Sequence, residues 1–378
     1  MSETADIVIV GAGIAGASLA WRLAPKCKVL LLEAEETPAF HSTGRSAALL
    51  TPYAGAPAIK ACSLASRNFL RNPPEGFTTY PLVSARGTLL MADATHEEEL
   101  IASAKEMQNV GRPVRMAPLS EAKKLGIPIS ERVVSLLIDD ETDDIDVNSL
   151  HMGFLTGAKK EGAQLYLQTP VTKLSQRSGI WTVTAGGRQF ESPIVVNAAG
   201  AFASNVATLA GAMRLPLSPK KRTIVMIPAT VREKSERWPL IADLKYSFYL
   251  KPEATGLLVS PVDAEPCKPH DVQPDEMDIA IAIDKMQQWL DIPVRRIERS
   301  WAGLRSFFPD EDPVVGYDAQ AEGFFWYAGQ GGFGVQSSPA LSKVGAALLL
   351  KEPLPEFCGF AGLHQNNFSP NRIMEFAR

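Results

Sequence analysis

The sequence has few of the side chains that build metal sites and disulfide frameworks. Its 378 residues include only four cysteines and five histidines. The cysteines stand at positions 27, 62, 267 and 358, and no two of them have CxxC spacing. The histidines are equally dispersed, so we expect no metal site. We interpret the cysteines as reduced, buried thiols, which are typical of a cytosolic protein.

A long apolar run and a surplus of basic residues are missing as well. No stretch reaches the roughly 18 apolar residues that a membrane-spanning helix needs, and residues 1–6 are acidic where a secretory signal would be basic. The net charge of −4, with both signs mixed along the chain, argues against nucleic acid as a partner. We therefore expect a cytoplasmic protein with no membrane span, and leave open a peripheral contact with the inner membrane.

What the chain does contain, near its start, is a pattern typical of a dinucleotide-binding unit. Residues 6–10 predict a buried parallel strand, residues 14–23 a helix and residues 29–32 a second strand. Glu33 closes the second strand, where a carboxylate can bind ribose hydroxyls and would repel the 2′-phosphate of NADP. The unit therefore indicates a nucleotide cofactor other than NADP.

Three glycines lie between the first strand and the helix, in the spacing GxGxxG. Gly11 permits the tight turn, Gly13 lets the backbone approach a pyrophosphate, and Gly16 lets helix and strand pack closely. The positive end of the helix then faces the phosphates. The cofactor contacts predicted for this unit are Gly11, Gly13, Ala15, Gly16, Glu33 and Ala34.

Three more segments of small residues favour FAD over NAD, because an NAD enzyme has no use for a glycine-rich segment so far from the fingerprint. Residues 41–48 follow the βαβ unit, and Arg45 among them can pair with a pyrophosphate. Residues 197–201 follow a buried strand, and residues 329–334 precede an apolar helix. The further contacts predicted are Ser42, Thr43, Gly44, Arg45, Ser46, Ala48, Val171, Ala199, Gly200, Gly331, Gly332 and Gly334.

That apolar helix is expected to run from Pro339 to Leu350, with Ser338 as its N-cap. Its N-terminus could stabilise negative charge on a reduced flavin ring. The acidic run 139–146 lacks the spacing of a calcium loop, so we expect a solvated loop there, followed by a helix capped by Asp146 or Asn148.

These segments resemble the D-amino acid oxidase-like flavoproteins, and among them most closely the bacterial catabolic D-arginine dehydrogenases. The shared runs are HSTGRSAA (41–48), VVNAAGA (195–201), SFYLKP (247–252), WAGLRSF (301–307), EGFFW (322–326) and QGG-G (330–334). The resemblance implies non-covalent FAD and hydride transfer from Cα of a D-amino acid to flavin N5. The imino acid formed would hydrolyse to a 2-oxo acid and ammonia, and a quinone or O2 would accept the electrons.

The expected fold class is α/β, with a Rossmann-like FAD-binding domain and an inserted β-rich α+β substrate domain. The cofactor-like segments lie near the start, middle and end of the chain, so the FAD-binding domain is discontinuous. We assign it residues 1–80, 145–215 and 308–378, and give the substrate domain residues 81–144 and 216–307. Residues 246–251 and 256–260 predict a hairpin within the substrate domain.

An enzyme that oxidises an amino acid must fix the carboxylate, and the guanidinium fork of arginine suits this. Arg305 stands in an otherwise apolar stretch and is our first choice for that role. The resemblance adds Arg222 and Tyr249 as carboxylate-binding residues. It also adds Thr51 to the predicted catalytic residues, because this sequence keeps the threonine of the subgroup there. The backbone carbonyl of Gly331 or Gly332 would receive the substrate amine.

Three positions depart from the D-arginine pattern. Leu49 stands where the subgroup has a histidine near the amine, and Ala54 where it has a loop tyrosine, with Tyr53 one place earlier. Thr88 stands where the subgroup has the glutamate that meets the guanidinium. Burying a cationic side chain without a partner is costly. Leu49, Leu50, Tyr53 and Thr88 therefore predict a pocket for a neutral, fairly apolar side chain.

Two other functions fit the same cofactor. Oxidation of a 2-hydroxy acid needs a base for the hydroxyl proton, usually histidine, and Leu49 argues against it. His41 is the nearest histidine in sequence, and we interpret it as structural. The chain could also be the flavoprotein subunit of a larger complex that oxidises amines or opines.

Overall fold

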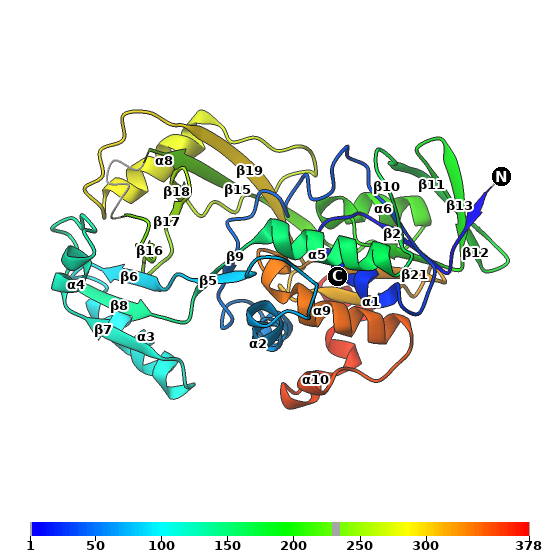
Figure 1. Ribbon diagram of the computed structural model, residues 1–378, viewed down its shortest axis with the longest axis horizontal. Coiled ribbons are helices and arrows are strands. Elements are labelled where there is room, and N and C mark those ends of the chain that lie inside the picture. Colours follow the sequence, from blue (N-terminus) through cyan, green and yellow to red (C-terminus); the bar gives the residue numbers. More distant parts are fainter. Residues whose placement is uncertain (1, 229–234, 378) are drawn as a thin grey trace.

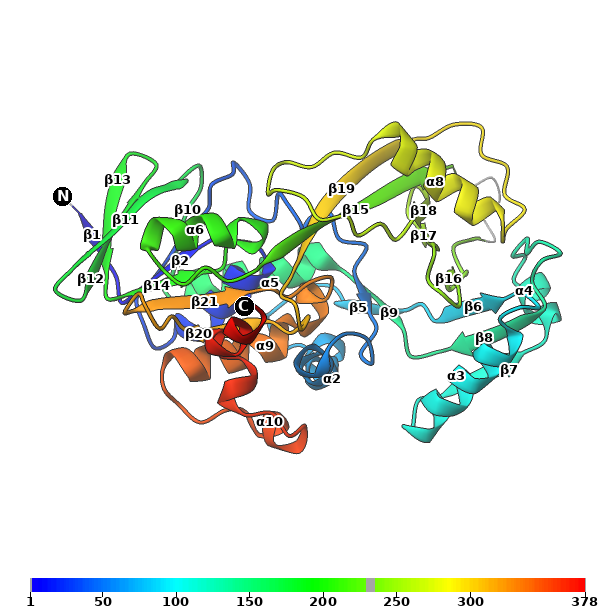
Figure 2. The ribbon, with the colours of Figure 1, turned by 180° about the vertical axis from the view of Figure 1, so that it is seen from behind.

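Two large β-sheets lie at opposite ends of an elongated molecule (Figure 1). The computed structural model describes residues 2–228 and 235–377. One sheet has six strands and carries the glycine fingerprint, and the other has eight. The long strands β15 (Ser218–Ile227) and β19 (Arg299–Phe307) run from the larger sheet to the centre of the molecule (Figure 2).

The six-stranded sheet has the order β10-β3-β2-β14-β21-β20, and only the last pair is antiparallel. Its strands are runs of apolar residues because both faces are covered. The strands predicted at 6–10 and 29–32 lie side by side in it. The bounds are β2 (Ile7–Val10), β3 (Val29–Leu32), β10 (Gln164–Tyr166), β14 (Ile194–Asn197), β20 (Val314–Tyr317) and β21 (Phe324–Ala328).

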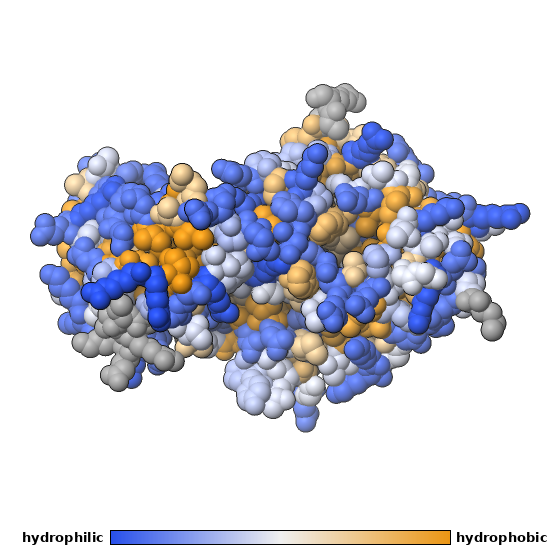
Figure 3. Space-filling model, turned by 90° about the horizontal axis from the view of Figure 1, so that it is seen from above, coloured by the Kyte–Doolittle hydropathy of each residue, from blue (hydrophilic) through white to orange (hydrophobic). Residues whose placement is uncertain are grey.

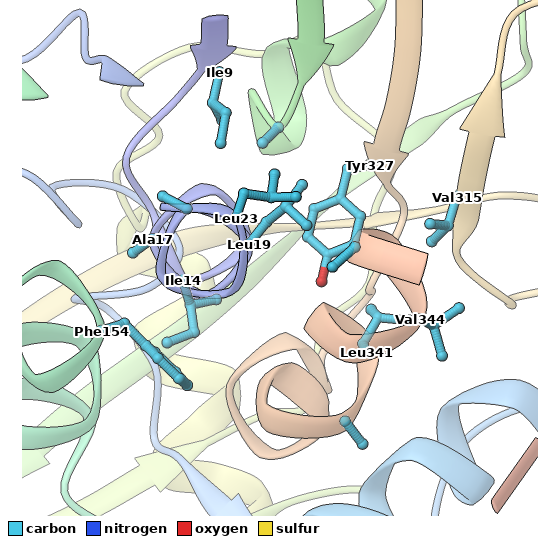
Figure 4. Packing of buried hydrophobic residues seen from close by; sticks show 14 of the residues in the cluster. Ile9, Ile14, Ala17, Leu19, Leu23, Phe154, Val315, Tyr327, Leu341 and Val344 are labelled. Carbon is cyan, nitrogen blue, oxygen red and sulfur yellow. The ribbon is translucent and has the colours of Figure 1, made fainter. Parts of the chain in front are cut away.

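Helices cover one face of this sheet, and a smaller sheet with one helix covers the other. Leu19 and Leu23 of the first helix lie beside Tyr327 of β21, with Leu341 and Val344 of a C-terminal helix below (Figure 4). The helices of this face are α1 (Ile14–Leu23), α2 (Pro57–Arg71), α5 (Val147–Lys160) and α9 (Gly334–Leu349). The opposite face carries β1 (Glu3–Thr4), β11 (Val171–Arg177), β12 (Ile180–Ala185), β13 (Arg188–Ser192) and α6 (Ala203–Ala210).

The eight-stranded sheet has the order β19-β15-β18-β17-β16-β6-β8-β7. Its other strands are β6 (Thr88–Ala92), β7 (Val114–Ala117), β8 (Ser135–Asp139), β16 (Leu240–Asp243), β17 (Tyr249–Glu253) and β18 (Gly256–Ser260). Helices α4 (Leu119–Lys124) and α8 (Glu276–Gln287) cover one face. Helix α3 (Glu97–Asn109) covers part of the other face, over β6, β7 and β8.

The predicted hairpin is present as β17 and β18, but its first strand begins three residues later than expected. Tyr246 has φ +49°, and its N–H bonds to the Asp243 carbonyl at 2.9 Å. It belongs to a turn because this left-handed conformation cannot continue a strand.

A three-stranded sheet of β4 (Leu49–Leu50), β9 (Asp143–Ile145) and β5 (Val83–Ala85) lies between the two large sheets. Short helices complete the chain: η1 (Gly200–Phe202), α10 (Glu356–Phe360), η2 (Gln365–Asn367) and η3 (Pro370–Ala377). The α/β fold class is confirmed, while the residue boundaries of the domains stay a prediction.

The surface seen from above is mainly hydrophilic, and its apolar groups form separate patches (Figure 3). Met277 and Ile281 of α8 are among the exposed apolar side chains. Among the described residues, no helix combines the length and the apolar character that crossing a membrane requires.

Candidate active site

Gly11 and Gly16 of the fingerprint lie where a side chain would collide with the backbone. Gly11 has φ +102°, and a Cβ there would lie 2.6 Å from the Ala198 carbonyl oxygen. A Cβ on Gly16 would lie 1.9 Å from the Gly11 carbonyl oxygen, so α1 can pack this closely only with glycine. At Gly13 a Cβ would stand 3.2 Å from Thr43 Oγ1. The turn, the end of β14 and the loop 41–48 therefore converge at one point.

The Glu33 carboxylate is buried and turned back toward the fingerprint. Its Oε2 accepts from Ala12 N at 2.8 Å, and its Oε1 from Glu35 N at 3.1 Å. Thr43 Oγ1 accepts from Ile14 N at 3.0 Å in the first turn of α1. Each carboxylate oxygen keeps further acceptor capacity. Glu33 is thus oriented by the backbone and can still accept hydrogen bonds from ribose hydroxyls, beside the positive end of α1.

Backbone hydrogen bonds bring the predicted mid-chain contacts to the same place. Ala198 N donates to Val10 O at 3.0 Å, and Ala199 and Gly200 follow directly, with φ +55° at Gly200. Thr169 N donates to Glu33 O at 2.7 Å, two residues before Val171. Ala34 is exposed at the end of β3.

The loop 41–48 is tied to strand β19 of the larger sheet. Ser42 Oγ donates to Leu304 O at 2.5 Å, and Trp301 Nε1 donates to Arg45 O at 3.1 Å. The Arg45 guanidinium pairs with Asp271 at 2.5 Å and donates to Ala302 O at 2.9 Å. Arg45 therefore joins this loop to β19 in the structure, and its predicted contact with a pyrophosphate stays a prediction.

The glycine-rich segment before α9 lies against the end of β19. Gly331 has φ +57°, and its N–H bonds to Ser306 O at 2.9 Å. A Cβ on Gly332 would lie 2.8 Å from Arg305 Nη1. The backbone at Gly331 and Gly332 is therefore beside the predicted carboxylate-binding arginine.

The expected start of the last helix at Pro339 is wrong: α9 begins at Gly334 and contains Pro339. A proline inside a helix leaves the carbonyl four residues earlier without its usual donor. That carbonyl belongs to Val335, and Ser338 Oγ donates to it at 2.9 Å. Ser338 thus compensates for the proline instead of capping the helix, and the positive end of α9 lies directly after the glycine-rich segment.

Arg222 and Arg305 lie on the same face of the eight-stranded sheet. Arg222 pairs with Gly303 across β15 and β19, and Lys220 pairs with Arg305. Paired residues, and alternate residues along a strand, share a face. A Cβ on Gly303 would lie 3.4 Å from Arg45 Cβ, so this face is turned toward the loop 41–48.

Tyr249 shares this face, because Leu258 of β18 pairs with both Met226 and Lys251. The Arg222 Nε donates to Asp263 O at 2.8 Å, and its guanidinium is hydrogen-bonded to Tyr249. Burial lowers the pKa of Arg222 and raises the pKa of Tyr249, and the interaction between the two groups opposes both shifts. Tyr249 therefore remains a neutral phenol that can donate a hydrogen bond.

The guanidinium of Arg305 is partly buried, and no carboxylate of the described residues lies within ion-pair distance of it. Its Nε is buried without a hydrogen-bond partner in the described chain. An unpaired, desolvated cation is unfavourable unless a ligand supplies the counter-charge. This face can therefore bind an anion.

The residues predicted to line the substrate pocket differ in how deeply they are buried. Leu49 is half-buried in the cluster that contains Tyr249, whereas Leu50 alternates to the opposite side and is fully buried in the other core. The Thr51 N–H donates to Gln336 Oε1 at 2.7 Å. The Thr88 hydroxyl is buried and bonds to Thr142 at 2.8 Å. The placement of Leu50 in the pocket is wrong, because neighbouring strand residues face opposite sides.

The expected solvated loop at 139–146 is also wrong, except at Asp140, which is exposed, and at Asp146, which caps α5 by accepting from Ser149 N at 2.8 Å. The remaining four acidic side chains make ion pairs that are partly or largely buried. The pairs are Asp139–Arg112, Glu141–Arg67, Asp143–Arg71, Asp144–Arg86 and Asp144–Lys251. Arg67 and Arg71, which pair with Glu141 and Asp143, lie one turn apart on α2.

His41 lies on the cofactor side of the molecule. Its Nε2 is 2.8 Å from Glu35 Oε1, and its ring packs against Phe40 and Phe202. Glu35 follows Glu33 by two residues, so these contacts hold the loop 41–48 near the end of β3. The structural interpretation of His41 agrees with this position, while its absence from the chemistry stays a prediction.

A family model described as FAD dependent oxidoreductase matches residues 6–348. The chain belongs to this family. FAD is therefore the cofactor, and the glycine turn, Glu33 and the N-terminus of α1 fit its ribose and phosphates. The similarity to D-arginine dehydrogenases in particular stays a prediction.

One similar protein and two similar solved structures bear the names of enzymes of amino acids or their N-methyl derivatives. Human mitochondrial dimethylglycine dehydrogenase is 29% identical over 272 residues, which cover 70% of this chain and 31% of that protein. The chain thus spans about a third of that relative's length. Two solved structures share the fold. Glycine oxidase from Geobacillus kaustophilus has a TM-score of 0.80 at 20% identity, covering 96% of this chain and 99% of its own. L-proline dehydrogenase from P. horikoshii has a TM-score of 0.81 at 21% identity, covering 100% and 99%.

The first prediction concerns how FAD is held. Every contact built above is non-covalent, so the purified protein should be yellow and should release free FAD when denatured. The measurement is an absorbance spectrum of the supernatant after acid or heat precipitation. Flavin colour that stays with the precipitated chain would contradict this account.

Proposed function

We propose that the protein removes a hydride from Cα of a D-amino acid with a neutral side chain, and so forms an imino acid. The imino acid then hydrolyses in water to a 2-oxo acid and ammonia. A quinone or O2 reoxidises the cofactor, and the cytoplasm is the proposed location. Bound FAD supplies the hydride acceptor.

The observation that carries this proposal is the unpaired guanidinium of Arg305 beside Gly332. Arg305 offers a fork for a carboxylate, and Arg222 with Tyr249 offers a second set of donors on the same face. A substrate carboxylate held there would lie next to the glycine-rich segment. Fixing the carboxylate also fixes Cα, which must approach the acceptor atom to within about 3–3.5 Å.

The named relatives support an amine as the group that is oxidised. Glycine, proline and dimethylglycine each carry an amine next to a carboxylate, which is the arrangement that this site would bind. The preference for D-amino acids rests on the sequence runs shared with the D-arginine subgroup. The preference for neutral side chains rests on Leu49 and the apolar cluster around Tyr249.

The main competing function is oxidation of a 2-hydroxy acid by the same carboxylate site. That reaction needs a base for the hydroxyl proton, and Leu49 and His41 provide none at the substrate face. The test is anaerobic mixing of the holoenzyme with a panel of D-amino acids, L-amino acids and 2-hydroxy acids. Loss of flavin absorbance with neutral D-amino acids supports the proposal, and bleaching by hydroxy acids alone would overturn it.

The second prediction concerns Arg305. Arg305→Ala should lower kcat/KM by about a hundredfold or more while FAD stays bound, because a charged, desolvated pair with the substrate carboxylate is lost. Arg305→Lys should recover only part of the activity, because lysine cannot supply the fork. Steady-state kinetics and the flavin content measure both effects.

The matched control is Arg296→Ala. Its side chain is 73% exposed and pairs with Glu298 at 3.4 Å near the surface, so its removal should leave the kinetics unchanged. Near-normal kcat/KM in Arg305→Ala would remove that residue from the site.

The third prediction concerns the amine proton. The reactive amine must be neutral, and the pocket residues named above include no group that titrates near neutral pH: burial raises the pKa of Tyr249 from a value already about 10. The kcat/KM should therefore keep rising with pH toward the pKa of the substrate amine.

His41→Asn, if it binds FAD, should leave the shape of this pH profile unchanged, because His41 pairs with Glu35. The measurement is kcat/KM between pH 6 and the alkaline limit of stability, with pH 6 chosen as roughly the histidine range. A plateau near pH 6.5, close to the usual histidine pKa of about 6.5, that disappears in His41→Asn would show that His41 is the base.

A further inference from the structure

We infer that Arg112 sets the side-chain specificity of this enzyme by occupying Asp139, the carboxylate that a cationic substrate would otherwise use. The inference rests on the proposed function and names the substrates that the site rejects. Arg112 pairs with Asp139 at the end of the eight-stranded sheet that faces α2 (Figure 1). Neither residue was singled out from the sequence as a specificity determinant.

Strand register places Asp139 on the substrate face of the sheet. Tyr249 pairs with Ala242, and Ala242 pairs with Leu90. Two residues from Leu90 along β6 lies Thr88, which pairs with Asp139. Because alternate residues share a face, Asp139 is on the face of Tyr249 and Thr88.

Apolar side chains between Tyr249 and Arg112 form what we call the wall. Leu49, Leu244, Met107 and Tyr249 each pack against one buried cluster, to which α3, β6, β8 and β16 contribute. The Met107 sulfur lies 3.7 Å from Arg112 Nη1. The guanidinium of Arg112 then stacks over the Tyr53 ring, with its carbon 5.1 Å from the ring centroid. A substrate whose carboxylate is held at Arg222 would extend its side chain along this wall toward Arg112.

The protein itself satisfies this ion pair incompletely. The Asp139 side chain is only 4% exposed and also accepts from Glu141 N at 3.0 Å. The Arg112 side chain is 16% exposed, and its Nε is buried without a hydrogen-bond partner in the described part of the chain. A buried donor without an acceptor indicates a place where a ligand or water completes the bonding.

The charges explain which side chains are excluded. An ammonium or guanidinium arriving at this wall would meet the positive charge of Arg112, and the carboxylate of Asp139 is already paired. A cationic side chain would therefore be desolvated beside the positive charge of Arg112, without the carboxylate of Asp139 as its partner. A neutral side chain meets no such penalty along Leu49 and Met107.

This assignment moves the specificity determinant from Thr88 to Arg112, which pairs with Asp139, the neighbour of Thr88 in register. Thr88 is 3% exposed and its hydroxyl is bonded to Thr142. A glutamate at position 88 would stand beside Asp139 and within the field of Arg112. Removing Arg112 would therefore free the carboxylate of Asp139 for a cationic substrate, whereas an acidic residue at position 88 would not.

The test removes the charge of Arg112 or of Asp139 in the FAD-loaded enzyme and measures which substrates are preferred. In Arg112→Met the carboxylate of Asp139 is unpaired, so the ratio of kcat/KM for D-arginine to that for D-leucine should rise by about tenfold or more. In Asp139→Asn the guanidinium of Arg112 is unpaired, so the ratio for D-glutamate to D-leucine should rise instead. The double variant Arg112→Met with Asp139→Asn should show neither gain.

Two controls separate specificity from general damage. Arg115→Met removes an arginine from the same segment that pairs with Glu121 at the surface, and it should leave all ratios unchanged. Because Arg112→Met leaves a buried charge, its melting temperature should be low and should rise with D-arginine but not with D-leucine. The same stabilisation should be absent in the double variant.

The outcomes are distinguishable. If the wild type oxidises D-leucine but neither single variant shifts its ratio, or if the double variant keeps the gain, the inference is overturned and the proposed function stands. If Arg112→Met does not fold even with D-arginine present, an unchanged D-glutamate ratio in Asp139→Asn also overturns it. If no amino acid bleaches the wild-type flavin, the proposed function fails and the inference fails with it.

Discussion

The site depends on the hydrogen bonds that fasten the loop 41–48 to strand β19. Ser42 donates to Leu304 O, Arg45 donates to Ala302 O, and Trp301 donates to Arg45 O. All three bonds end on backbone carbonyls, so they fix distance and orientation between the cofactor-binding loop and the strand that carries Arg305. The proposed hydride transfer would tolerate little misplacement of Cα, so it would depend on this fixed spacing.

A second set of contacts ties the segment 139–144 to α2 and to strand β17. The segment 139–144 places Glu141 and Asp143 against Arg67 and Arg71 of α2, and Asp144 against Lys251 of β17. The Asp143 and Lys251 side chains are nearly inaccessible to solvent. Removing the partner of either one would therefore leave a buried charge without its ion pair, which is destabilising. The eight-stranded sheet is thus fastened by two sets of contacts, one through the loop 41–48 and one through the segment 139–144. The Arg112–Asp139 pair lies at the end of the second set.

The sequence predicted the features that depend on neighbours in the chain. The glycines at 11, 13 and 16 and the end of β3 at Glu33 follow from local geometry, because tight turns and close helix packing allow few alternatives. Arg305 could be proposed as a carboxylate-binding residue because an arginine in an apolar stretch needs a counter-charge, and that role stays a prediction. The fold class followed from the order of these segments along the chain.

The features that failed depend on residues far apart in the chain. Helix α9 accommodates Pro339 only because Ser338 bonds to the Val335 carbonyl, which no propensity rule anticipates. The acidic run 139–146 has the composition of a solvated loop, and its partners on α2 and β17 are revealed only by the fold. The proposed role of Arg112 could not be predicted from the sequence, because it follows from the register of strands that lie far apart in the chain.

The most direct test of the central claim is a titration of the oxidised holoenzyme with benzoate, a carboxylate that cannot be oxidised, followed by the flavin absorbance spectrum. A saturable spectral change in the wild type that weakens strongly in both Arg305→Ala and Arg222→Ala is the predicted result. An equal response in all three proteins, or none in the wild type, would contradict a carboxylate site in front of the flavin.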